Sequence, residues 1–84
     1  MKLKVNQTTF FKQSTLDSSK LLSQDKVSVS AGKTFEIHPW KAIGKNHLKV
    51  ALFNESLGDP PRNTWYVYQH HVQLINSQGE TAQP

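Results

Sequence analysis

Residues 63–75 read NTWYVYQHHVQLI and hold three of the chain's eight aromatic residues and two of its four histidines. Side chains along a β-strand point alternately to opposite faces of the sheet, so only one face of this stretch can enter a small core. Alternation groups Trp65 with Val67 on one face and Tyr66 with Tyr68 on the other. The stretch therefore raises the question of which face packs inside and what the other face contacts.

The composition predicts one small soluble domain. The chain has 84 residues, of which 36% are hydrophobic and 19% are charged. It contains no cysteine, which excludes disulfides and zinc–thiolate sites and leaves packing to supply the stability. No apolar run approaches the roughly 20 residues of a transmembrane helix, and the start turns polar before a signal-peptide hydrophobic region could form. We therefore expect no membrane association, and either a cytoplasmic location or a module whose export depends on something outside this sequence.

Alternating apolar and polar residues dominate the chain from residue 26 onward. In residues 26–37, KVSVSAGKTFEI, two valines alternate before an Ala-Gly turn, and phenylalanine and isoleucine alternate after it, which predicts a β-hairpin. Further strands are expected at residues 47–53 (HLKVALF), at residues 64–74 and, once or twice, within residues 3–13. Five or six short strands without a long helix predict an all-β fold, a small closed or half-closed barrel.

Long irregular segments are expected between these strands. Residues 13–26 are rich in serine and aspartate and predict a loop with one helical turn near residues 18–22. Residues 38–46 also read as irregular, and residues 54–63 predict an exposed loop stiffened by two adjacent prolines. The polar residues 76–84 predict a flexible tail, so the folded domain is expected to span residues 1–75.

The order of these pieces resembles the SH3-like barrels of bacteria, the SH3b class. The segment DKVSVSAGKTFEI is similar to the strand–glycine–strand hairpin of that family, and HLKVAL resembles its middle strand. TWYVYQHHVQL is similar to its closing segment. Over roughly residues 8–75 the chain most resembles small modules appended to cyanobacterial and phage cell-wall hydrolases. The resemblance implies a small SH3-like barrel of five to six strands with long irregular loops.

The resemblance also assigns faces to the closing segment. SH3-like barrels of the eukaryotic type end with a core residue, a groove-facing residue, a short 3₁₀ turn, a groove-facing aromatic residue and a second core residue. Aligned to that pattern, Val67 and Val72 take the core positions, while Tyr68 and His71 face a ligand. Strand alternation then extends both sets. The expected inward residues are Trp65, Val67, Val72 and Leu74, and the expected groove residues are Tyr66, Tyr68 and His71.

Five residues are candidates for a ligand site. Tyr66, Tyr68, Trp40 and His71 could form a shallow platform for a peptide, a glycan or a base, with Arg62 of the proline loop anchoring a carboxylate or phosphate. The alternative is that the tyrosines cover the core edge, Trp40 covers one end of the barrel and Arg62 belongs to a stiff connection. Many SH3b repeats carry an asparagine–valine–arginine–serine–glycine–proline signature. Residues 10–19, FFKQSTLDSS, lack its arginine, glycine and proline, so no ligand set tied to that signature is transferred.

The sequence offers little for metal, cofactor or catalytic chemistry. Adjacent residues of a strand point to opposite faces, so His70 and His71 could share a metal ion only if the turn intervenes, and no carboxylate lies near them in sequence. The carboxylates show no paired arrangement, and the serines lie in no nucleophile motif. The four glycines are isolated, so no phosphate-binding loop is present. We expect no metal, no cofactor and no enzymatic activity.

The charge leaves the partner open. The net charge is +4 and the pI is near 9.6, but nine of the ten basic residues are dispersed lysines. Arginine, the residue most suited to bidentate phosphate contacts, occurs once. We expect a monomeric, non-catalytic module that binds cell-wall peptidoglycan, through its glycan or its peptide. A nucleic-acid-binding barrel and a protein–protein adaptor in a larger assembly are the alternatives.

Overall fold

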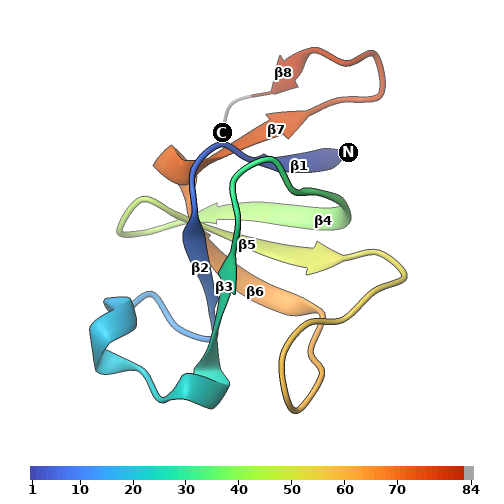
Figure 1. Ribbon diagram of the computed structural model, residues 1–84. Helices are drawn as coiled ribbons and strands as arrows, with labels where there is room; N and C mark the ends of the chain where they lie inside the picture. The colour runs from blue at the N-terminus through green and yellow to red at the C-terminus, as the bar shows by residue number, and fades with distance from the viewer. Residues whose placement is uncertain (83–84) are drawn as a thin grey trace.

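The computed structural model describes residues 1–82, which form eight β-strands and three short 3₁₀ helices (Figure 1). The strands are β1 (Lys2–Val5), β2 (Thr9–Lys12), β3 (Lys26–Val29), β4 (Thr34–Ile43), β5 (His47–Leu52), β6 (Thr64–Tyr68), β7 (Val72–Ile75) and β8 (Thr81–Ala82). The 3₁₀ helices are η1 (Ser18–Lys20), η2 (Ser23–Asp25) and η3 (Gln69–His71). No helix within residues 1–82 is long and apolar enough to cross a membrane.

The strands form one antiparallel arrangement in the order β3-β2-β6-β5-β4-β1-β7-β8, which confirms the predicted all-β class. Figure 1 shows β2 and β3 running across the direction of β5 and β6. The strand count exceeds the expected five or six. Part of the excess comes from the short β8, which the sequence pattern did not predict.

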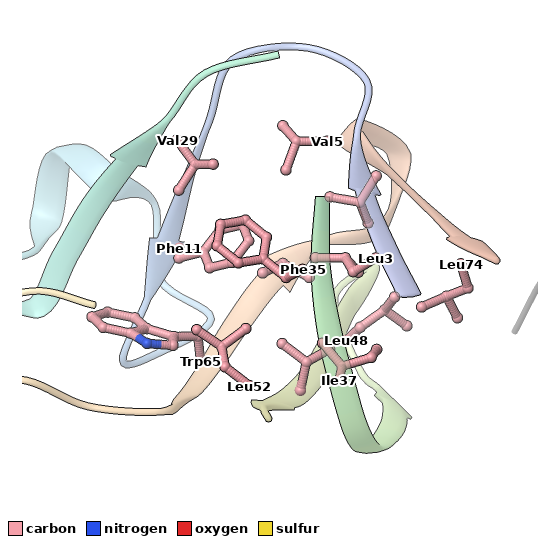
Figure 2. Packing of buried hydrophobic residues seen from close by; sticks show 13 residues of the cluster. Leu3, Val5, Phe11, Val29, Phe35, Ile37, Leu48, Leu52, Trp65 and Leu74 are labelled. Atoms are coloured by element: carbon pink, nitrogen blue, oxygen red, sulfur yellow. The ribbon is translucent and has the colours of Figure 1, made fainter. Parts of the chain in front are cut away.

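One hydrophobic core draws residues from every strand from β1 to β7, so the sheet must curve around it (Figure 2). Trp65 and Val67 of β6 are fully buried, and Leu74 and Val72 of β7 are 1% and 7% exposed. The predicted sidedness of the closing segment is therefore confirmed. The remaining core residues are Leu3, Val5, Phe11, Val29, Phe35, Ile37, Leu48, Val50 and Leu52.

The predicted hairpin over residues 26–37 is wrong in its pairing. β3 pairs with β2, whereas β4 pairs with β1 and β5. The turn between β3 and β4 makes its hydrogen bonds with β1 instead of closing a ladder. The N–H of Gly32 donates to the carbonyl of Val5 at 2.8 Å, and the N–H of Val5 donates to the carbonyl of Lys33 at 2.8 Å. Gly32 has φ +94°, which glycine adopts without steric cost, and the two strands diverge from it.

Residues 38–46 were expected to be irregular, but β4 continues through them to Ile43. The ladder between β4 and β5 shifts register between Ile37 and Trp40, and Pro39 lies inside this irregularity, where the missing N–H breaks no regular pair. A tight turn then reverses the chain at Lys45 and Asn46, which have φ +61° and +58°. Such paired positive φ values are typical of hairpin turns whose twist matches that of the strands.

The segment predicted as a flexible tail folds back on β7 as far as the structure describes it. Leu74 pairs with Ala82 and Ile75 pairs with Thr81. The side-chain oxygen of Asn76 accepts hydrogen bonds from the backbone N–H groups of Gln78 and Glu80, both at 3.0 Å, and these bonds stabilise the turn. Residues 83 and 84 of the predicted tail lie outside the described residues.

Candidate functional site

An open groove of about 690 Å³ lies where β5 begins and β6 ends. Tyr68, His47, His71 and Lys12 contribute to its lining, together with residues 15–20 of the long loop that follows β2. We call this hollow the Tyr68 groove. The β5–β6 ladder builds its centre, because His47 and Tyr68 are direct cross-strand partners.

Three histidine rings surround the Tyr68 ring edge-on. Their centroids lie 4.7 Å (His71), 5.1 Å (His70) and 5.6 Å (His47) from that of Tyr68, and edge-to-face packing is a favoured geometry for aromatic pairs. Tyr68 is half-buried and not part of the core cluster. Its ring is therefore held in place by neighbours while it still lines an open hollow.

His71 is positioned by the 3₁₀ helix η3 and by β2. The 3₁₀ turn that the resemblance implied is present between Tyr68 and Val72. His71 Nδ1 lies 2.7 Å from the hydroxyl of the buried Thr9, and the backbone carbonyl of His71 accepts a hydrogen bond from the N–H of Asn6 at 2.8 Å. These bonds fix the imidazole ring against the groove.

His47 is 5% exposed, and one of its ring nitrogens has no hydrogen-bond partner in the part of the chain that the structure describes. Its Nδ1 lies 2.6 Å from the carbonyl of Lys45, and because a carbonyl only accepts, Nδ1 donates and carries the proton. Nε2 is buried and has no hydrogen-bond partner within the described residues. Burial lowers the pKa of His47, and the charges of Lys12 and Lys45 lower it further against the opposing effects of the Lys45 carbonyl and Asp17.

Lys12 lines the groove and is only 7% exposed. It points away from the core residue Phe11 on β2, but residues of the following loop cover it. Its ammonium donates to the carbonyl of Leu16 at 2.9 Å. Burial lowers the pKa of Lys12, and the negative charge of Asp17 partly opposes this effect.

The structure brings together two of the five predicted site residues, Tyr68 and His71. Tyr66 lines a separate hollow of about 450 Å³ on the outer face of β4, β5 and β6, together with Lys41 and Lys49. Trp40 is half-buried and packs against the core. It contributes to the lining of neither hollow.

Arg62 is bound to the protein itself. Its guanidinium forms an ion pair with Asp25 at 3.3 Å and donates to the carbonyl of Gln24 at 3.1 Å. These contacts tie the proline loop to the end of the long loop after β2. The arrangement matches the alternative of a stiff connection.

Within residues 1–82, no group of three or more histidine, aspartate or glutamate side chains is placed to hold a metal ion. Three histidines meet around Tyr68, but they contact its ring and His71 also bonds to Thr9. The arrangement suits the binding of a ligand by stacking and hydrogen bonds.

Comparisons with protein-family models, with curated proteins and with solved structures found no match to this chain. The SH3-like resemblance therefore rests on the sequence pattern, and the function has to be argued from the Tyr68 groove.

Acidification below about pH 6.5 is expected to destabilise the fold through His47. The imidazole takes up a proton near pH 6.5 in an unfolded chain, but its pKa is lower in the folded protein. Below pH 6.5 the unfolded state therefore binds more protons, and the free energy of unfolding falls as the pH falls. Urea unfolding at pH 7.5, 6.5 and 5.5 measures this slope.

The matched variants are His47→Asn, which keeps a side-chain donor near the Lys45 carbonyl, and His38→Gln at an exposed histidine. His47→Asn should flatten the slope between pH 6.5 and 5.5, and His38→Gln should keep the wild-type slope. Equal slopes for His47→Asn and wild type would show that another group causes the acid sensitivity.

Proposed function

We propose that this domain is a non-catalytic binding module and that the Tyr68 groove holds a segment of cell-wall peptidoglycan. The observation that carries the proposal is the placement of Tyr68. The ring lies on the outward face of β6, is fixed by three histidine rings and lines an open groove. Tyrosine combines a large apolar body with a polar tip, which suits a residue that packs against a ligand.

The chemistry of the lining supports this ligand class. Hydroxyl groups of Thr9, Thr15 and Ser18 lie around the groove beside the tyrosine and histidine rings. Peptidoglycan offers sugar rings that pack on aromatic faces, and amide and carboxylate groups that bond to hydroxyls, imidazoles and ammonium groups. The groove is open and small, so we expect affinities in the micromolar range or weaker.

Tyr68→Ala is expected to weaken binding to purified peptidoglycan fragments about tenfold or more, because it removes the ring at the centre of the groove. An NMR titration of the labelled domain measures the affinity and maps the contact. Tyr66→Ala is the matched control, because it removes the same side chain from the same face of β6 at a different hollow. Two results would contradict the proposal. One is that the ligand leaves the NMR signals of Tyr68, His71 and Lys12 unchanged, and the other is that Tyr68→Ala and Tyr66→Ala lose the same affinity.

A single-stranded nucleic acid is the second candidate ligand, and the hollow at Tyr66 favours it. Lys41 and Lys49 are directly opposite each other on β4 and β5, and Tyr66 is the next partner in the row on β6. Directly opposed like charges destabilise a sheet, whereas phosphates would neutralise them while a base stacks on the tyrosine. If this function holds, Tyr66→Ala and not Tyr68→Ala weakens oligonucleotide binding, and the affinity falls steeply with salt.

A further inference from the structure

Lys12 carries a charge that the folded chain leaves incompletely paired. An ammonium group has three N–H donors, and within residues 1–82 that of Lys12 has one hydrogen-bond partner, the carbonyl of Leu16. The ion pairs within residues 1–82 join the terminal amine to Glu36 and Arg62 to Asp25, so neither involves Lys12. Asp17 is near enough for its negative charge to act on Lys12, but it forms no ion pair with Lys12 within the described residues, so a bound anion would stabilise this ammonium further.

The surroundings of Lys12 are electropositive. Lys20 and Lys45 also line the Tyr68 groove, and Asp17 contributes the one carboxylate among the lining side chains of the described residues. His47 also lines the groove, and burial lowers the pKa of its imidazole, which disfavours a positive charge on that ring. The lining therefore carries an excess of positive charge, which attracts an anionic group of a ligand toward Lys12.

We propose that Lys12 is an anion subsite of the Tyr68 groove and binds a free carboxylate of a peptide ligand. This inference rests on the proposed function, and it names the peptide carboxylate as the part of peptidoglycan that the groove recognises. The carboxylate accepts hydrogen bonds from the N–H donors of Lys12 that Leu16 leaves unused. Tyr68 and His71 pack against the neighbouring atoms of the peptide. The glycan strand has no charge along its acetylated sugars and therefore supplies no counter-charge for Lys12.

The experiment compares two forms of one probe, a synthetic peptidoglycan stem pentapeptide with free carboxylates and the same pentapeptide with every carboxylate amidated. NMR titration gives the affinity of each form for the wild type and for Lys12→Met, which removes the ammonium and keeps an unbranched side chain one atom shorter. Amidation and Lys12→Met should each weaken binding about tenfold. Together they should weaken it no further than either alone, because both remove the same contact.

Lys49→Met is the matched control, because it removes the same charge from an exposed residue that lines the other hollow. It should leave the preference for the free carboxylates intact. Should Lys12→Met fail to fold, the comparison of the two peptide forms on the wild type and on Lys49→Met still decides the question.

Two results overturn this inference and leave the proposed function standing. One is equal affinity of the wild type for the free and amidated peptides. The other is Tyr68-dependent binding of intact peptidoglycan without any binding of the pentapeptide. If the wild type binds no peptidoglycan at all, both this inference and the proposed function are overturned. If Lys49→Met loses as much affinity for the free pentapeptide as Lys12→Met does, the effect is general charge attraction and the subsite is overturned.

Discussion

Trp65→Ala is expected to remove a large part of the domain's free energy of unfolding. Trp65 is fully buried and is the largest side chain of the core. Removing a buried tryptophan typically costs about 3–5 kcal/mol, because the surrounding residues collapse only partly into the cavity. A domain of this size has a total free energy of unfolding of roughly 5–12 kcal/mol, so one such loss removes a large share of it.

The surroundings of Trp65 make a full collapse of this cavity difficult. The indole Nε1–H donates to the carbonyl of Arg62 at 2.9 Å, and Gly58 lies so close that a Cβ there would be 3.3 Å from the six-membered ring. The indole therefore packs against the long loop between β5 and β6 as well as filling the core. Its removal loosens this loop in addition to opening a cavity.

Urea unfolding followed by circular dichroism measures the effect. Trp40→Ala is the control, since Trp40 has the same side chain but is half-buried. We expect a distinctly smaller loss for Trp40→Ala. Equal losses in the two variants, or a Trp65→Ala midpoint close to that of the wild type, would contradict the burial of Trp65.

The face assignments were predictable because they depend on local periodicity. In β6 and β7 the buried residues alternate as a period of two requires, so Trp65, Val67, Val72 and Leu74 could be placed before the structure was known. The 3₁₀ turn between Tyr68 and Val72 followed from the resemblance. These features are fixed by residues a few positions apart.

Strand pairing was less accessible, because it depends on contacts between residues far apart in sequence. The alternation in residues 26–37 looks the same whether the two strands pair with each other or with β1, β2 and β5. The hydrogen bonds between the 30–33 turn and Val5 decide between these possibilities. Pro39 likewise predicts the end of a strand when only the sequence is considered. In the sheet it lies at a register shift, and β4 continues past it.

The residues of the candidate site were also predictable only where they depend on local sequence. Tyr68 and His71 could be proposed from the closing segment, but Lys12 and His47 could not. Lys12 alternates with Phe11 as a surface lysine would, and only the covering loop buries it. His47 becomes part of the site through its pairing with Tyr68, which requires the register of β5 against β6. The sequence indicates Lys12 and His47 only as a lysine and a histidine near the ends of strands.

Phe11→Ala is expected to cost about 3–5 kcal/mol of stability, because Phe11 is fully buried and its ring packs 5.3 Å, centroid to centroid, from that of Phe35. Phe10 precedes it on β2 and points to the other face. It is 38% exposed, and the ammonium of Lys26 lies 5.3 Å from its ring centroid. An exposed cation–π contact contributes about 0.5–1 kcal/mol, so Phe10→Ala should cost about 1 kcal/mol or less.

The pair tests the orientation of β2, on which the Tyr68 groove depends. The sequence TTFFKQ did not tell which phenylalanine enters the core, and a one-residue shift of β2 would exchange their faces and move Lys12 into the core. Thermal and urea unfolding of both variants decides between the two registers. If Phe10→Ala proves the more destabilising change, β2 is turned over, and Lys12 cannot then line the Tyr68 groove to bind a carboxylate.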